Sequence, residues 1–205
     1  RCDPPRGRLS NKKTNAAKSS SKKTSKNSKA KDPMKTLNIW NWVLAGLHAV
    51  QGIAVLYFSS SSLFSVTTNY LTVDALSGTD EAPVLVSAQR TLFDFNLAYL
   101  VAAFFFMSAI AHLIIATVYR KRYEAGLKVG INRARWYEYG ISASTMMIAI
   151  AMLSGVTDAS LLIMIFGATL VMNLLGLVME VVNQGKDKPN WLSYIVGTIA
   201  GLGPW

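Results

Sequence analysis

The feature that most constrains this chain is a series of long apolar runs, which start at residue 37 and recur as far as residue 205. A helix crosses the roughly 30 Å hydrocarbon core of a bilayer with about 20 residues at a rise of 1.5 Å each. The sequence therefore predicts an all-α membrane protein. Its expected spans cover about residues 37–58, 91–119, 134–154, 159–183 and 191–205.

The last of these runs is shorter than a full span. From Trp191 to Trp205 it offers about 15 residues, or roughly 22 Å of helix. We therefore expect the chain to be a part of a larger helical bundle, with further spans after Trp205. In this interpretation residues 37–205 form one transmembrane bundle.

The N-terminal segment has the opposite composition. Its first 36 residues hold 12 of the 21 Lys and Arg residues and few large apolar side chains. Such a segment buries too little apolar surface to offset its ordering entropy, so residues 1–36 are predicted to be a disordered basic tail. Its lysines are suited to attract anionic lipid head groups, at about 1 kcal/mol per basic residue near the surface. The alternative is a solvated tail that only sets the topology.

The remaining basic residues predict the orientation. Apart from Arg90, every Lys and Arg outside the tail lies near the connection after the second run or in the one after the fourth. Basic residues concentrate on the cytoplasmic side of membrane proteins. We therefore expect a multi-pass protein with a cytoplasmic N-terminus. The first outer connection, residues 59–88, alternates in polarity from Ser65 to Val73 and indicates a short β-hairpin outside the membrane.

Ionisable residues inside apolar runs are costly and are candidates for function. His48, His112 and Glu138 all lie about 8–15 Å from the inner end of their predicted helices. At this matched depth the three are expected to meet around one polar cavity. Taken singly, each could instead be satisfied by helix packing, with Glu138 at the inner surface or paired with Arg135. Glu180, near the inner end of the fourth run, is interpreted as an interfacial or a helix-pairing residue.

Two further polar positions lie on the same helix faces as these groups. Gln51 follows His48 by three residues, and Ser142 and Met146 follow Glu138 by four and eight. The stripe from Glu138 to Met146 is either the wall of a binding site or ordinary helix packing.

The third run carries a specific signature. The segment NRARWYEYGISASTM, residues 132–146, resembles the third helix of the heliorhodopsins, which are retinal-binding membrane proteins. Its core is Arg-Trp-x-Glu-Tyr followed by Ser-x-Ser-x-Met. The resemblance extends over residues 37–205 and includes the inner-side histidines, the long first loop and the cytoplasmic N-terminus.

The resemblance implies a rhodopsin-like bundle in which five of seven helices are present, all-trans retinal as cofactor, and a homodimer. Glu138 would be the counterion of the protonated retinal Schiff base. The polar network beside it would comprise His48, Gln51, His112, Asn132 and Tyr139. The retinal pocket would be lined by Ser142, Met146, Asn173, Gly176, Pro204 and Trp205.

One departure from the family pattern concerns the attachment of retinal. The family uses a lysine on its seventh helix, and no lysine lies within the five apolar runs of this chain. The chain by itself is therefore expected to lack the residue that forms the Schiff base.

Three functions remain open at this point. The resemblance favours a light-sensing photoreceptor that is not an ion pump. A proton channel or transporter that uses His48, His112 and Glu138 is the alternative, and a structural membrane protein is the third. The sequence shows no nucleophile–base pair, metal cluster or phosphate loop of recognisable spacing. An enzyme is thus the least favoured class, and no nucleic-acid partner is expected.

Overall fold

The computed structural model describes residues 33–60, 63–74, 76–77, 79 and 82–204. The predicted disorder of the tail and the predicted role of Trp205 lie outside these residues, except that the tail's last four residues are helical. The described elements, in chain order, are α1 (Pro33–Phe58), β1 (Leu63–Val73), β2 (Leu85–Asn96), α2 (Leu97–Ala116), α3 (Arg120–Lys128), α4 (Arg133–Leu153), α5 (Ala159–Val182) and α6 (Leu192–Leu202).

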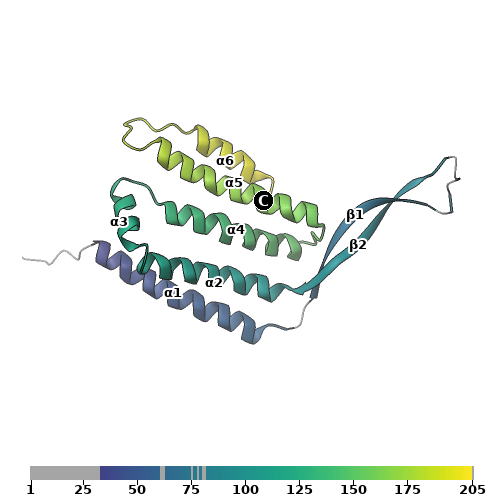
Figure 1. Cartoon of the computed structure of the whole chain (residues 1–205), viewed down its shortest axis with the longest axis horizontal. Coiled ribbons are helices and arrows are strands. Elements are labelled where there is room, and N and C mark those ends of the chain that lie inside the picture. Colours follow the sequence, from purple (N-terminus) through teal and green to yellow (C-terminus); the bar gives the residue numbers. More distant parts are fainter. Residues whose placement is uncertain (1–32, 61–62, 75, 78, 80–81, 205) are drawn as a thin grey trace, which may run out of the picture. The chain divides into compact units, whose positions relative to one another are not determined.

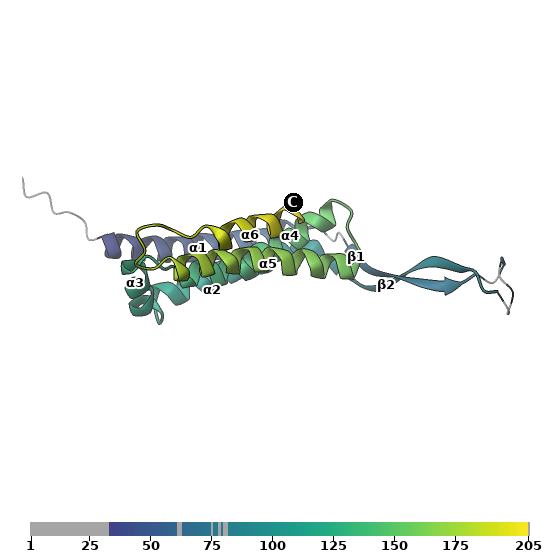
Figure 2. The same ribbon diagram turned by 90° about the horizontal axis from the view of Figure 1, so that it is seen from above.

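Five of the helices lie side by side in chain order, as Figures 1 and 2 show. α1 packs on α2, α2 on α4, α4 on α5 and α5 on α6. Of the described helices, α1, α2 and α5 are long and apolar enough to span a bilayer, and α6 is a shorter apolar helix. α4 has 21 residues, but its first two turns contain the charged residues Arg133, Arg135 and Glu138, and it is not among the helices that are apolar enough to span. The count of five spans stays a prediction.

The first helix begins before the predicted boundary at residue 37. Pro33 opens α1. Proline is favoured at the first helical position because its missing N–H has no partner there and its φ is already helical.

The predicted start of the second span at Thr91 is wrong. Residues 91–96 belong to β2, and α2 begins at Leu97. Asn96 caps this helix by accepting a hydrogen bond from the Ala98 N–H at 2.9 Å. The end differs as well, because α2 stops at Ala116 and the chain re-forms as the short helix α3.

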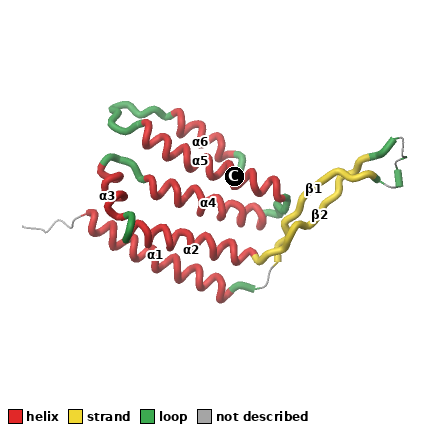
Figure 3. Tube along the Cα trace, in the orientation of Figure 1, coloured by secondary structure: helices red, strands yellow, loops and turns green. Residues whose placement is uncertain are grey.

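The connection between α1 and α2 contains an antiparallel pair of strands, drawn in yellow in Figure 3. The pairing runs from Leu63 with Asn96 to Val73 with Leu85. Its register shifts after Val66, where Leu92 is the extra residue of a bulge. The strands are longer than the Ser65–Val73 segment that the sequence indicated.

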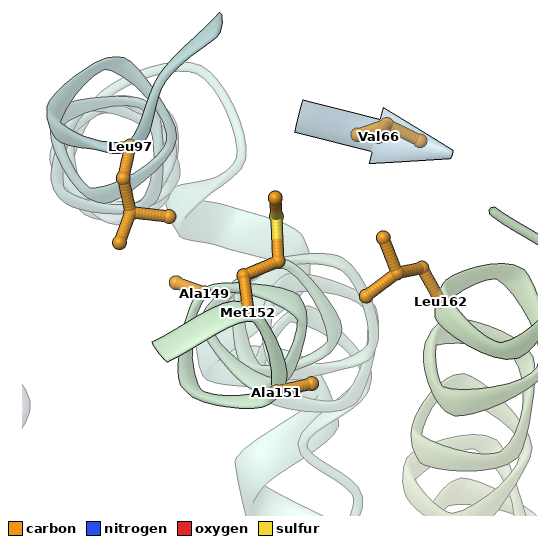
Figure 4. Close-up of a cluster of buried hydrophobic side chains, with 6 residues drawn as sticks. All are labelled: Val66, Leu97, Ala149, Ala151, Met152 and Leu162. Carbon is orange, nitrogen blue, oxygen red and sulfur yellow. The ribbon is translucent and has the colours of Figure 1, made fainter. Parts of the chain in front are cut away.

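A small apolar cluster joins the base of this hairpin to the helices (Figure 4). It contains Val66 of β1, Leu97 of α2, Leu162 of α5, and three residues of α4: Ala149, Ala151 and Met152. Each of the six is at least 92% buried, so the hairpin base and three helices share one core. This core lies at the end of the bundle opposite α3.

Candidate functional site

Two histidines from neighbouring helices stack on each other. The rings of His48 in α1 and His112 in α2 lie 5.7 Å apart between centroids and are inclined by 15°. Each ring is oriented by one amide. Nδ1 of His48 lies 3.0 Å from Oε1 of Gln51, and Nδ1 of His112 lies 2.9 Å from Oδ1 of Asn41.

These contacts define the tautomers. An amide oxygen only accepts hydrogen bonds, so each Nδ1 carries the proton and donates it. The Nε2 atom of each neutral imidazole then keeps its lone pair. The stack of His48 and His112 thus presents two nitrogen atoms that are able to accept a proton.

Glu138 lies on the neighbouring helix α4 and is half-buried. Its Oε1 accepts a hydrogen bond from the hydroxyl of Ser108 in α2 at 2.7 Å. Among the described residues, no Lys, Arg or His lies within ion-pair distance of this carboxylate. Arg135, the basic residue nearest to it in sequence, is engaged elsewhere: its guanidinium pairs with Glu180 at 3.2 Å.

A cavity of about 190 Å³ lies beside Glu138 and His112, and Arg135 and several apolar side chains also line it. The predicted residues among its walls are His112, Asn132, Glu138 and Tyr139. His48 and Gln51 adjoin it through the ring stack. The structure therefore brings the predicted polar network together from α1, α2 and α4.

Two members of the network were not predicted from the sequence. Asn41 is 5% exposed and orients His112, while Ser108 is 5% exposed and holds Glu138. Asn41 is a polar residue inside an apolar run, and Ser108 lies four residues before His112 on one helix face. Both features can be seen in the sequence, but neither indicates which residue of another helix is the hydrogen-bond partner.

Glu180 acts as the helix-pairing residue that its position suggested. Besides the ion pair with Arg135, its other carboxylate oxygen accepts the backbone N–H of Asn132 at 2.7 Å. The carboxylate at the end of α5 thus satisfies a free N–H at the start of α4. A carboxylate near a helix N-terminus also interacts favourably with the helix dipole.

The predicted pocket residues do not all surround one cavity. Asn173 and Gly176 line a second cavity of about 350 Å³ between α4, α5 and α6, which Trp136 also borders. Trp136 and Glu138 are two residues apart, or about 200° around the helix, so they point to opposite sides of α4. A single retinal pocket that includes all the predicted residues stays a prediction.

Of the other predicted pocket residues, the three that the structure describes are not among the walls of either cavity. Ser142, one turn beyond Glu138, is 2% exposed. Met146 packs against the apolar cluster at the hairpin base. Pro204 is half-buried after the end of α6, and Trp205 is not described.

The apolar helices that pack in chain order beside a half-buried acid and two imidazoles fit a helical membrane protein of the rhodopsin type. The heliorhodopsin family model matches residues 37–205, so this chain belongs to the heliorhodopsin family. The resemblance seen in the sequence is thereby confirmed, and with it a retinal-based membrane protein at the level of the family. A search among curated proteins gave no match.

One observation on the described residues fits the cationic end of a retinal cofactor. The half-buried carboxylate of Glu138 has no ion-pair partner among them, although Arg135 lines the same cavity. A buried anion is costly unless it is paired. Trp136, whose Nε1 is buried without a hydrogen-bond partner among the described residues, borders the second cavity on the opposite side of α4.

Proposed function

We propose that this chain belongs to a light-sensing retinal photoreceptor in which Glu138 is the counterion and which does not pump ions. The observation that carries the proposal is the Glu138 carboxylate, held by Ser108 next to two stacked imidazoles and lacking a cation among the described residues. When bound, retinal supplies absorption of visible light and, as a protonated Schiff base, one positive charge.

The residues of this chain would hold that charge by electrostatics. The Ser108 hydroxyl donates to one oxygen of Glu138, which orients the carboxylate. Ser142 and Met146 would continue the wall along α4, and Asn173 and Gly176 would contribute from α5. Tyr139 and Asn132 would complete the polar wall of the cavity on the inner side.

The imidazole pair would hold or accept a proton near Glu138. Nε2 of His48 and Nε2 of His112 are the basic atoms, because each Nδ1 donates to an amide oxygen. Amides that bind both rings also keep them parallel, so the pair is preorganised for its role.

A sensory role is supported by the outer half of α4. The sequence from Ser142 to Leu153 has no second carboxylate that would relay a proton outward. The two acids near that end have structural partners. Asp94 accepts from Ser65 within the hairpin, and Asp158 caps α5.

The orientation and the partners are part of the same proposal. The positions of Lys and Arg support a cytoplasmic N-terminus, and the basic tail would lie against anionic lipid head groups. Membership of the family supports a homodimer.

The direct test is expression of the full-length gene product with all-trans retinal. We expect a coloured protein whose visible band shifts in Glu138→Gln. In an alkaline titration the visible band of this variant should fade at a lower pH than that of the wild-type protein. The reason is that the protonated Schiff base would lose its proton more easily without the neighbouring carboxylate. Glu124→Gln is the matched control, since that carboxylate lies on α3 and pairs with Arg120.

The absence of a visible band in the wild-type protein would refute a photoreceptor. Equal spectra and equal alkaline titrations for Glu138→Gln and Glu124→Gln would refute the role of Glu138 alone.

The second candidate is a proton channel or transporter, and the stack of His48 on His112 favours it because basic nitrogen atoms in series suit proton transfer. We expect no light-induced change of pH in a suspension of cells that express the protein. A light-induced change that His48→Gln and His112→Gln abolish would favour the transporter over the photoreceptor.

A further inference from the structure

A third cavity, of about 350 Å³, lies at the end of the bundle where α2 ends and α4 begins. It is formed by α3, the start of α4 and the end of α5. Its polar walls are Tyr119, Arg122, Tyr123, Arg133 and Gln184. The histidines and Glu138 do not border this cavity, but it adjoins the proposed light-sensing site, because Tyr123 lines both cavities.

The charge of this cavity is not compensated by the surrounding protein. Glu124, the acid of α3, is taken by Arg120 at 2.7 Å, and Glu180 is taken by Arg135. Among the described residues, Arg122 and Arg133 have no ion-pair partner. Two exposed arginines without an ion-pair partner thus line one cavity.

The turn between α3 and α4 brings both arginines to one cavity. Ile131 donates its backbone N–H to the carbonyl of Gly126 at 3.0 Å, and a Cβ at residue 126 would lie 2.8 Å from the Ile131 carbonyl oxygen. Gly130 has φ +78°, a conformation that glycine adopts without strain. The chain therefore folds back tightly between α3 and α4, and Arg122 and Arg133 line the same cavity.

The tyrosines add a hydrogen-bond donor at neutral pH. Burial raises the pKa of Tyr123, so its phenol keeps its proton well into the alkaline range. Tyrosine is also favoured at the membrane–water boundary. The C-terminal end of α2 and the N-terminal end of α4 would place this cavity at that boundary.

We propose that this cavity binds a phosphate group, with Arg122 and Arg133 as its charge partners. A guanidinium offers two parallel N–H donors that match two phosphate oxygens. The volume of about 350 Å³ lies within the range of about 300–1,000 Å³ typical of small-ligand sites and leaves room for the group that carries the phosphate. This phosphate belongs either to a lipid head group or to a soluble phosphate ester.

The experiment compares two probes with the same head group. Phosphatidic acid is the lipid probe, and glycerol 3-phosphate is the soluble probe without acyl chains. Binding of each to the full-length protein in detergent is measured by native mass spectrometry. Phosphatidylcholine, whose phosphate is accompanied by a cation, is the lipid control. We expect phosphatidic acid to bind more tightly than phosphatidylcholine.

The variants separate a site from general attraction by charge. In Arg122→Gln with Arg133→Gln, the affinity for the bound probe should fall about tenfold or more, because charged hydrogen bonds are lost. The control is Lys121→Gln with Lys128→Gln, which also removes two positive charges but changes no residue that lines the cavity. The affinity of this variant for the probe should remain within about threefold of the wild-type value. Arg122→Lys with Arg133→Lys keeps the charge but loses the paired donors, so an intermediate affinity is expected.

The two probes identify the source of the phosphate. Binding of phosphatidic acid alone indicates a lipid site, whereas binding of both probes indicates a site that also accepts soluble esters. Equal losses in the arginine and lysine double variants, or no binding of either probe, would overturn the proposal. Gel filtration of each variant verifies that it is folded.

Discussion

At the scale of single residues, the packing between α4 and α5 depends on a missing side chain. A Cβ at Gly176 would lie 2.3 Å from the ring of Trp136, far inside van der Waals contact. The indole therefore occupies the space that any other residue at 176 would need. Arg135 lies over the same ring, with its Cζ 4.5 Å from the centroid, and also pairs with Glu180. One aromatic side chain thus connects the packing of α5 with the ion pair at the start of α4.

Gly176→Ala should lower the stability of the protein by about 1–3 kcal/mol, because the indole must shift in a packed interface. The measurement is the midpoint of thermal unfolding in detergent. Gly167→Ala on the same helix is the control, since nothing lies within 4 Å of a Cβ there. This control should be neutral or slightly stabilising, given the better helix propensity of alanine. Equal midpoints for the two variants would contradict the role assigned to Trp136.

At the scale of elements, the hairpin between α1 and α2 is closed by side-chain hydrogen bonds at its far end. The Asp74 carboxylate accepts from the Ser77 hydroxyl and, at 3.0 Å, from the backbone N–H of Leu76. The Ser77 hydroxyl, followed by this N–H, holds the pKa of Asp74 below its ordinary value. The turn is therefore an Asx-type turn whose hydrogen bonds favour the ionised carboxylate.

Ser77→Ala should raise the pKa of Asp74 toward its ordinary value, because the largest cause of the lowering is removed. Because the pKa of Asp74 is lower in the folded turn than in the unfolded chain, the ionised carboxylate stabilises the turn at any pH above the ordinary aspartate pKa. This stabilisation is lost as the pH falls through the lowered pKa of the folded turn. Carboxyl carbon-13 NMR of aspartate-labelled protein measures both titrations.

Ser65→Ala is the control, because that hydroxyl donates to Asp94 instead. It should leave the titration of Asp74 unchanged. An unchanged Asp74 titration in Ser77→Ala would show that the hydroxyl does not stabilise the carboxylate.

At the scale of the whole described chain, one acid joins the hairpin to the helices. Oδ1 of Asp158 caps α5 by accepting from the Leu161 N–H at 3.1 Å. Its Oδ2 accepts from the side-chain amide of Asn69 at 3.1 Å and from the Asn69 backbone N–H at 3.3 Å. Nearby, the Thr67 N–H donates to the Thr157 carbonyl at 2.8 Å. Asp158 therefore acts both on α5 and on β1.

Asp158→Ala should speed hydrogen–deuterium exchange in β1 and in the first turn of α5, because it removes a cap and two bonds to the hairpin. Loss of the cap alone costs about 0.5–2 kcal/mol. Asn69→Ala should speed exchange in the hairpin only. Asp187→Ala, at the opposite end of α5, should leave both regions unchanged. If Asp158→Ala sped exchange in α5 but not in β1, Asp158 would not connect the hairpin to α5.

Much of the helical framework was predictable because a membrane span is a local property of the sequence. The fourth run gave the range 159–183, and α5 covers Ala159–Val182. The signature around Glu138 was sufficient to identify the family, since it lies within one continuous helix. The start of α2 was mistaken because Phe93 and Phe95 are as apolar as a span. Only their pairing with Val66 and Phe64 of β1 makes them strand residues.

The sequence by itself determined the apolar helices, the polar positions within them and the family. Run length, composition and a contiguous motif are all properties of neighbouring residues. The tertiary structure alone decided which polar groups meet. Ser108 reaches Glu138 across 30 positions, and Asn41 reaches His112 across 71. Such pairs depend on the rotation and packing of separate helices, because each side chain points in one direction that no local pattern records. The same reason explains why Trp136 and Glu138, two residues apart, border different cavities.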